Sequence, residues 1–434
     1  MRAVVVALGK IGLPIAVQIA RAGHEVVGCD IDAHVVAQVN DAVEPFPGEA
    51  GLAEALAEVV GAGRLRAATD TTAAVAEGAD LVVAVPPLVV GADAQPDFAV
   101  LDAVVAAIGA GLRARASGSG STSGSAPTTV SIETTLPVGT TRGRVAPALA
   151  AASGLRSEQD FFTVHSPERV YSGRIFADLR TYPKLVGGLS EAGEARASEL
   201  YRSFLEAEVR GMGGAEAAEL TKLAETTYRD VNIALANEFA AYADSIGVDV
   251  DRVIDAANSQ PFSHIHRPGI AVGGHCIPVY PRFYLAGDET ARLAGTAREV
   301  NEAMPAYAVR RLADALGGRP AGLRVLVLGA AYRGGVKETA FSGAFGVVAE
   351  LERRGATPFV SDPLFSADEL TALELPPWDG EPVDALVVQA DHGEYRALTP
   401  GDFPGVRAVL DGRGILDPTP WREAGVPLLR IGRP

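Results

Sequence analysis

A glycine-containing turn near the N-terminus has the residue types that bind the phosphates of a dinucleotide. Residues 7–12 read Ala-Leu-Gly-Lys-Ile-Gly after a Val-rich run, and Asp30 ends the next such run. In the dinucleotide fingerprint, glycines let the backbone approach the pyrophosphate, and the following helix N-terminus donates N–H groups to it. An acid about 20 residues later binds ribose hydroxyls and repels a 2′-phosphate. Gly9, Lys10, Ile11, Gly12 and Asp30 therefore predict an NAD site, although Ala7 replaces the first glycine.

A second candidate for chemistry is Cys276, which follows Gly273, Gly274 and His275. A flexible approach of this kind presents a thiolate to a ligand. Beside a dinucleotide, such a nucleophile suits the oxidation of an aldehyde through a thiohemiacetal and a thioester. A lone cysteine is also commonly a small buried apolar residue, and spacing alone leaves both interpretations open.

Two charged residues extend this chemistry. Lys222 lies in a long Ala/Leu/Glu-rich segment, where a solvated helix face is the simpler interpretation. Glu168, within residues 165–169 (His-Ser-Pro-Glu-Arg), follows an apolar run and either places a carboxylate at the nicotinamide or belongs to an ordinary turn. Only four of the 38 basic residues are lysines, namely Lys10, Lys184, Lys222 and Lys337, so each lysine is a candidate.

The elements that position these residues follow from the hydrophobic pattern. Short apolar runs without alternation alternate with amphipathic stretches, which indicates a parallel sheet covered on both faces by helices. We expect strands at 2–8, 25–30, 80–85 and 129–134, and helices at 12–22, 33–40 and 98–113. The Gly/Ser-rich segment 115–127 is expected to be a flexible insertion within this first domain.

The rest of the chain contains a long helix and a second α/β region. Residues 215–246 contain no Gly or Pro, which predicts one helix about 45 Å long. Such a helix bridges domains or forms a dimer core. After it, the pattern predicts strands at 323–329, 357–360, 384–389 and 407–410 and a helix at 343–354. Two α/β domains joined by a helical middle is the simplest architecture.

Composition excludes several classes. The 434 residues are 48% hydrophobic and 21% charged, which excludes extensive disorder, and the net charge of −16 argues against nucleic-acid binding. No apolar run is long enough for a membrane span. Two cysteines give no disulfide framework, and the His/Cys spacing lacks the paired ligands of a zinc site, so no metal is expected. We expect a cytoplasmic protein.

Several motifs together resemble the UDP-glucose/GDP-mannose dehydrogenase family over essentially the full length. They are Ile11-Gly12-Leu13-Pro14, residues 134–141 (Thr-Thr-Leu-Pro-Val-Gly-Thr-Thr), Ser166-Pro167-Glu168-Arg169, Lys222 with residues 229–234, and Gly273-Gly274-His275-Cys276-Ile277-Pro278. Asn237-Glu238 and the His-Cys-Ile-Pro variant most resemble the branch that oxidises UDP-N-acetylhexosamines.

The resemblance implies an α/β fold with two Rossmann-like doubly wound domains joined by a long central helix and a helical middle domain. The implied ranges are 1–200 for NAD binding, 201–305 for dimerisation and the catalytic Cys, and 306–434 for UDP-sugar binding. It implies a homodimer through the long helix. The implied reaction oxidises the C6 alcohol of a UDP-sugar, either a UDP-hexosamine or a UDP-hexose, to a carboxylate and reduces two NAD.

The resemblance also assigns roles to residues. Cys276 traps the aldehyde, Lys222 stabilises the oxyanion, Thr135 holds a water, Glu168 is a base near that water, and Thr226 replaces an Asn that binds oxyanion or sugar. Further cofactor contacts are Pro86 and Thr135. The implied substrate-binding residues are Glu168, Arg169, Lys222, Arg267, Gly273, Tyr280 and Arg333.

Several positions depart from the family pattern where the chemistry takes place. Tyr280 replaces an Asp four residues after the Cys, and Ala340 replaces an Arg expected near the substrate. Losing a general base costs about 10²–10⁴-fold in rate. Three alternatives therefore stay open: an oxidation that stops after one hydride transfer, a redox-neutral reaction, and a non-catalytic binding protein.

Overall fold

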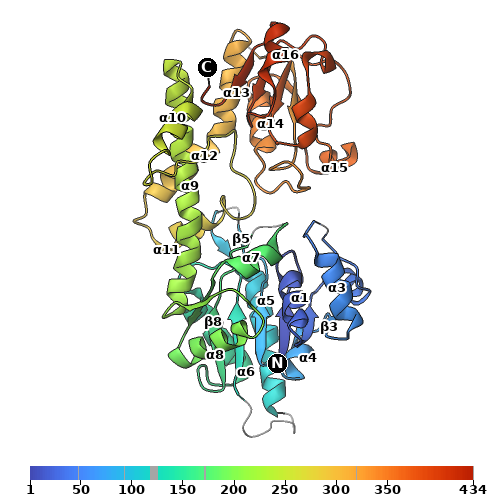
Figure 1. Ribbon diagram of the computed structural model, residues 1–434, viewed down its shortest axis with the longest axis vertical. Helices are drawn as coiled ribbons and strands as arrows, with labels where there is room; N and C mark the ends of the chain where they lie inside the picture. Colours follow the sequence, from blue (N-terminus) through green and yellow to red (C-terminus); the bar gives the residue numbers. More distant parts are fainter. Residues whose placement is uncertain (47, 92, 118–125, 171–172, 319, 434) are drawn as a thin grey trace. The chain divides into compact units, whose positions relative to one another are not determined.

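The computed structural model describes residues 1–46, 48–91, 93–117, 126–170, 173–318 and 320–433 (Figure 1). The chain forms two compact units, Met1–Glu225 and Thr226–Pro434, which meet within one helix. None of the helices in these ranges is long and apolar enough to cross a membrane.

The first unit is built on an eight-stranded sheet with the order β10-β9-β8-β7-β4-β1-β2-β3. Its strands are β1 (Arg2–Val6), β2 (Glu25–Cys29), β3 (Leu65–Ala68), β4 (Leu81–Ala84), β7 (Thr128–Ile132), β8 (Phe161–His165), β9 (Lys184–Gly188) and β10 (Val209–Gly211). The first six are parallel, as expected, and Val4 pairs with Val27 on one side and Val82 on the other. The expectation of a wholly parallel sheet is wrong at the edge formed by the last two strands. There β9 runs antiparallel to β8, and β10 runs parallel to β9.

Helices flank this sheet in two groups, as a doubly wound fold requires. The first group, α1 (Gly12–Arg21), α3 (Leu52–Gly61) and α7 (Ile175–Thr181), packs together, as does the second, α4 (Thr71–Ala76), α5 (Ala99–Ser117) and α6 (Ala146–Ser153). The unit also contains α2 (Ala33–Asn40), α8 (Glu191–Arg202), the π-helical turn η1 (Thr141–Val145) and a short hairpin of β5 (Val89–Val90) and β6 (Pro96–Asp97).

The expected flexible insertion begins later than the sequence suggests. Residues 115–117 are the last turn of α5. The Arg115 guanidinium donates hydrogen bonds to the Ala79 carbonyl (2.8 Å) and to Thr128 Oγ1 (2.6 Å), which hold this turn on the sheet. The expectation is therefore wrong for 115–117, and its stretch 118–125 lies outside the described residues.

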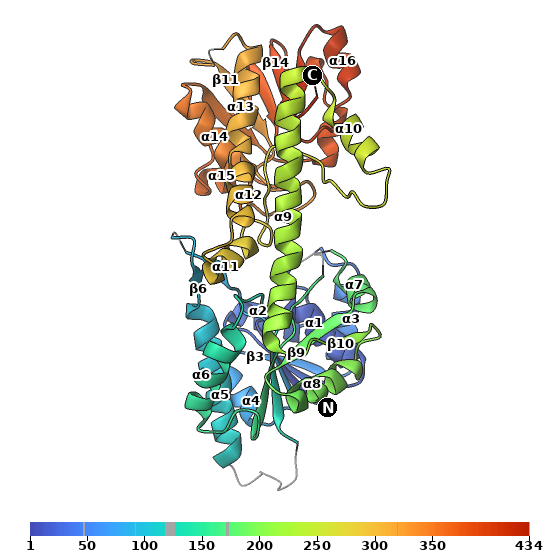
Figure 2. The same ribbon diagram turned by 90° about the vertical axis from the view of Figure 1, so that its left-hand side faces the viewer.

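The long helix is α9 (Ala215–Ile246), with the bounds expected from the sequence (Figure 2). Its first turns are attached to the loop after β7 by Glu219, a fully buried carboxylate. Glu219 accepts hydrogen bonds from the backbone N–H of Gly139 (2.6 Å), the N–H of Thr141 (2.8 Å) and the Thr141 hydroxyl (2.7 Å). These bonds compensate the cost of removing the carboxylate from water.

The second unit contains a parallel sheet with the order β12-β11-β13-β14-β15. Its strands are β11 (Arg324–Leu328), β12 (Thr357–Ser361), β13 (Ala385–Val388), β14 (Ala408–Asp411) and β15 (Leu428–Arg430). The helices are α10 (Val250–Ala257), α11 (Tyr280–Gly287), α12 (Leu293–Glu302), α13 (Met304–Ala315), α14 (Gly343–Arg353), α15 (Ala367–Ala372) and α16 (Pro418–Glu423), with α13 packed on α14. The strand order reverses between β11 and β13, and ligands of such sheets bind at that switch point.

Candidate active site

The turn between β1 and α1 has the shape required to hold a dinucleotide. Ala7 has a φ of 73°, and this directs its carbonyl at Gly12, where a Cβ would lie 1.9 Å from that oxygen. Gly9 has no atom within 4 Å of its Cβ position, so nothing in the first unit covers its backbone there. The α1 N-terminus has no side-chain cap at Ile11. Leu13 donates its N–H to the Gly9 carbonyl (3.1 Å) and Pro14 has no N–H, so the open backbone at Gly9 and the positive end of the α1 dipole are what fit the pyrophosphate of NAD.

Asp30 lies at the end of β2, beside this turn. One carboxylate oxygen accepts the N–H of Leu8 (2.8 Å) and the other accepts the N–H of Asp32 (3.0 Å). The carboxylate is partly exposed and each oxygen keeps a further acceptor site, as ribose recognition requires. Across the same sheet edge, the Pro86 carbonyl accepts a hydrogen bond from Thr134 (2.5 Å), next to the buried Thr135.

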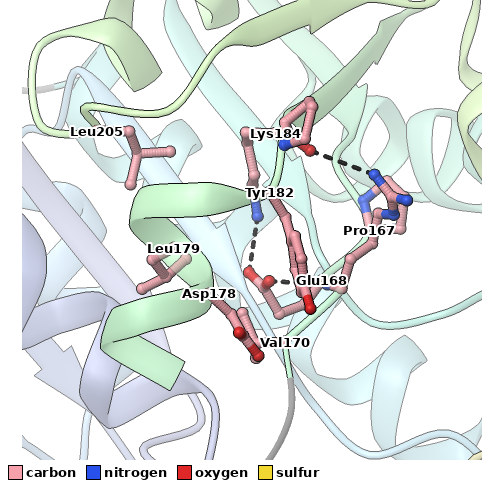
Figure 3. Close-up of a pocket in the computed structure, with 10 residues that line it drawn as sticks. Pro167, Glu168, Val170, Asp178, Leu179, Tyr182, Lys184 and Leu205 are labelled. Atoms are coloured by element: carbon pink, nitrogen blue, oxygen red, sulfur yellow. Dashed lines mark hydrogen bonds and ion pairs between the residues drawn. The ribbon is translucent and has the colours of Figure 1, made fainter. Parts of the chain in front are cut away.

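Glu168 follows β8 and points at the first residue of β9 (Figure 3). Its carboxylate accepts a hydrogen bond from Lys184 Nζ (2.9 Å) and another from the N–H of Arg169 (2.7 Å). Burial alone would raise the pKa of Glu168, but the Lys184 cation and these hydrogen bonds bring it below its ordinary value. Glu168 is thus held ionised, in the form that a general base needs.

Arg169 turns away from Glu168. Its guanidinium forms an ion pair with Glu225 on α9 (2.7 Å) and donates to the Pro183 carbonyl (3.4 Å). The structure therefore places this predicted substrate-binding residue in a contact between α9 and the end of the sheet. Lys222 and Thr226 lie one turn apart on the same helix, and Thr226 is buried.

Cys276 lies in the second unit, on the exposed loop before α11. The N–H of Gly274 donates to the Ala340 carbonyl (2.8 Å), and His275 Nε2 contacts the Glu338 carboxylate. A Cβ on Gly273 would lie 2.6 Å from the Tyr332 side chain, so this glycine permits the loop to pack closely. The loop is thereby attached to the segment that follows β11, at the switch point of the second sheet.

The other cysteine has the opposite environment. Cys29 is completely buried in β2, and burial raises the pKa of its thiol to about 11. Of the two thiols, Cys276 is the one exposed to solvent. Its exposure favours the interpretation of Cys276 as a nucleophile over its interpretation as a buried apolar residue.

Models of one family match all three parts of the chain. They are the UDP-glucose/GDP-mannose dehydrogenase family's NAD-binding domain at residues 1–205, its central domain at 216–303 and its UDP-binding domain at 326–418. The chain belongs to this family. Membership identifies NAD as the cofactor of this dehydrogenase and makes it an oxidoreductase that acts on an alcohol of a nucleotide sugar.

Individual relatives agree with this assignment. UDP-N-acetyl-D-mannosamine dehydrogenase of Pyrococcus horikoshii is 36% identical over 432 residues, which cover 97% of each chain. NDP-N-acetyl-D-galactosaminuronic acid dehydrogenase of Ralstonia solanacearum is 33% identical, with 95% of each chain covered. The structure of the UDP-D-ManNAc dehydrogenase from P. horikoshii matches with a TM-score of 0.86 at 33% identity, covering 100% of this chain and 99% of that chain.

Three predicted substrate residues of this dehydrogenase make contacts within the second unit. Arg267 forms ion pairs with Asp251 (3.3 Å) and with Asp255 on α10. Arg333 follows β11, and its Nε donates to the hydroxyl of Tyr332 (3.2 Å). Tyr280 is the first residue of α11 and donates its N–H to the carbonyl of Cys276 (2.9 Å). The departure at position 280 therefore lies one helical turn from the exposed thiol.

Sequence reasoning missed the groups behind Glu168. Glu133 and Tyr201 gave no signal, since each lies within an ordinary strand or helix pattern, yet both are buried beside Lys184. The rarity of lysine marked Lys184 as a candidate without assigning it to this site.

Proposed function

We propose that this chain is a UDP-hexosamine 6-dehydrogenase that oxidises the C6 alcohol to the uronic acid through Cys276. The observation that carries the proposal is the exposed Cys276 thiol on a loop attached to the switch point of the UDP-binding sheet. The named activities of relatives that match nearly the whole chain, which act on N-acetylmannosamine and N-acetylgalactosaminuronic acid nucleotides, support the sugar class.

The proposed reaction proceeds through a covalent intermediate on the Cys276 thiol. NAD supplies the hydride acceptor for both oxidations. The Cys276 thiolate adds to the C6 aldehyde, and the resulting thiohemiacetal is oxidised to a thioester. Water then attacks the thioester carbon, the C–S bond breaks, and the thiol and the sugar carboxylate are released. Glu168 accepts the proton of this water.

The remaining residues bind and orient. Lys222 donates to the oxyanion, a contribution of about 3–4 kcal/mol per donor, and Thr226 adds a hydroxyl one turn along. Thr135 holds the attacking water beside the cofactor. The residues that bind the cofactor are Gly9, Lys10, Ile11, Gly12, Asp30 and Pro86. The sugar nucleotide contacts Glu168, Arg169, Lys222, Arg267, Gly273, Tyr280 and Arg333.

A second candidate function is favoured by Tyr280. Because the family Asp that helps to activate hydroxyl and water is absent, an enzyme that stops after one hydride transfer is the principal alternative. The test is the number of NADH formed per sugar consumed across UDP- and GDP-sugars. Two NADH and a uronic acid support the proposal; one NADH supports the alternative; none, despite NAD binding, supports a non-catalytic protein.

We also propose a homodimer formed through α9 and the domain ranges 1–200, 201–305 and 306–434. The family-model matches at 1–205, 216–303 and 326–418 support these ranges. Six large apolar side chains of this helix are exposed: Leu220, Tyr228, Leu235, Phe239, Tyr242 and Ile246. At 100° per residue the spacings of seven, four, three and four place the last five within one narrow stripe. A long apolar stripe exposed on one helix face is typical of an interface.

A further inference from the structure

A buried ionic cluster lies directly behind Glu168. It consists of Ser131, Glu133, Lys184, Tyr201 and Glu168 itself. Lys184 Nζ donates to Glu133 (2.6 Å) and to Glu168 (2.9 Å), and the three side chains are at most 10% exposed. The Tyr201 hydroxyl donates to Glu133 and lies 2.8 Å from Ser131 Oγ. One cation thus serves two carboxylates, of which Glu168 lines the pocket in Figure 3.

The two carboxylates compete for this cation. Burial raises the pKa of Glu133 to about 7, despite its bonds to Lys184 and Tyr201. Lys184 counteracts burial at Glu168 and lowers its pKa, and a hydrogen bond with Glu133 lowers it further. When Glu133 carries the proton, Lys184 neutralises Glu168 alone; when both are ionised, the cation is shared.

Other charged groups around Glu168 do not replace Lys184. Arg169 gives Glu168 a backbone N–H, while its guanidinium pairs with Glu225. His165 on β8 is completely buried, and burial and the Lys184 cation lower its pKa to about 3, so it is neutral. Asp178 and Tyr182 line the same pocket and carry no positive charge, and Asp178 forms an ion pair with Arg174 (2.9 Å).

We propose that Lys184 is a positioning residue that keeps Glu168 oriented and ionised for proton abstraction, and that Glu133 sets how strongly it does so. This inference rests on the proposed role of Glu168 as the base. Without the cation, burial and the repulsion between the two carboxylates would both raise the pKa of Glu168, so the base would take up its proton at a higher pH. Removing the second negative charge as well would return Glu168 to its ionised form.

The test is the pH profile of kcat for the wild type, Lys184→Met, Lys184→Arg and the double variant Lys184→Met/Glu133→Gln. Lys184→Met is expected to move the acidic limb to higher pH by about 1–3 units, as loss of a neighbouring opposite charge does. Its activity at pH 7 falls and recovers at pH 9, while KM for sugar and NAD stays within about threefold. Lys184→Arg follows the wild type, and the double variant regains at least half of the shift.

Two results would overturn the inference. One is a Lys184→Met loss that is equal at every pH, because this indicates a merely structural role; the other is no loss. Arg156→Met is the matched control, since it also breaks a cation–carboxylate pair in the first unit, the exposed one with Asp160, and its profile should not move. If Lys184→Met does not fold, Glu133→Gln alone tests the inference. The acidic limb of its pH profile must not lie at a higher pH than that of the wild type, and an acidic limb at higher pH contradicts the inference.

A further readout separates this inference from the proposed function. The infrared carboxylate band lost in Glu168→Gln reports Glu168 ionisation without turnover. Titration of this band in wild type and Lys184→Met should show the same 1–3 unit displacement. If no sugar is oxidised but the band shifts, the proposed function fails and the electrostatic role of Lys184 stands; if the band does not shift, the role fails whatever the activity.

Discussion

The carbonyl oxygen of Ala7 occupies the space in which a side chain at Gly12 would begin, 1.9 Å from the Cβ position. Because the obstacle is backbone, Gly12→Ala must displace the turn or the start of α1. We expect it to destabilise the protein by about 1–3 kcal/mol or more and to abolish NAD binding. Thermal unfolding and NAD titration by calorimetry measure the two effects.

Gly9→Ala is the matched control for this variant. Nothing lies within 4 Å of its Cβ position, so the melting temperature should not change, whereas NAD affinity should fall because the backbone must approach the pyrophosphate. An unchanged NAD affinity in both variants would place the cofactor elsewhere.

Ala7→Gly is expected to be stabilising. Ala7 adopts a φ of 73°, a region that costs an L-residue about 1–2 kcal/mol and costs glycine little. The larger backbone entropy of glycine in the unfolded chain offsets about 0.5–1 kcal/mol of this gain. Urea denaturation should show a net increase of up to about 1 kcal/mol. A less stable Ala7→Gly would show that the methyl group contributes packing that exceeds the strain.

How far the sequence predicts this molecule depends on whether the determinants are local. The long helix and the first strands were predicted to within a few residues, because an uninterrupted helical composition or a Val-rich run is a local signal. The reversal at β9 was not, since no local pattern distinguishes a parallel from an antiparallel neighbour. The sequence alone predicts an insertion from Arg115, because the hydrogen-bond partners that hold this residue, Ala79 and Thr128, lie 36 and 13 positions away.

The same distinction applies to the candidate site. Gly12 and Asp30 belong to one βαβ unit and are predictable from spacing. The cluster behind Glu168 joins residues separated by 16, 51 and 68 positions, and such long-range pairs leave no periodic pattern. Glu133 and Tyr201 therefore emerged only from the fold.

Alkylation should distinguish the two cysteines. With its pKa raised to about 11, Cys29 is ionised to about one part in a thousand at pH 8, and burial removes it from reagent as well. We expect iodoacetamide to modify Cys276 at least about 100-fold faster. Peptide mass spectrometry over time measures both rates, and Cys276→Ser shows the rate of Cys29 alone. Equal rates would contradict an exposed Cys276.

The stripe on α9 predicts the effect of one charge on assembly. Tyr242 is 66% exposed at the stripe, and Tyr242→Asp would bury an unpaired carboxylate in the proposed interface. Light scattering after size exclusion should show a dimer for the wild type and a monomer for the variant. Val100→Asp is the control, because it places the same charge at an exposed apolar position of α5. A dimer that persists in Tyr242→Asp would exclude this face.

Glu133→Gln predicts a pH-dependent gain in stability. Burial raises the pKa of Glu133 to about 7, above the value of about 4.3 for glutamate in an unfolded chain. The native state therefore binds this proton more tightly, and the resulting stabilisation is complete below about pH 4 and is lost as the pH rises through 7. Glutamine stays neutral and has no such loss.

The free energy of unfolding of the variant, relative to that of the wild type, should consequently rise by about 1–3 kcal/mol from pH 5 to pH 8. Urea denaturation at both pH values measures this difference. Glu199→Gln is the control, since this exposed carboxylate, 2.8 Å from Arg196, should give a difference that is nearly independent of pH. A relative gain at pH 8 that does not exceed the one at pH 5 would mean that Glu133 stays ionised in the native state over this range. In that case Lys184 would be shared equally at every pH, and Glu133 would not modulate Glu168.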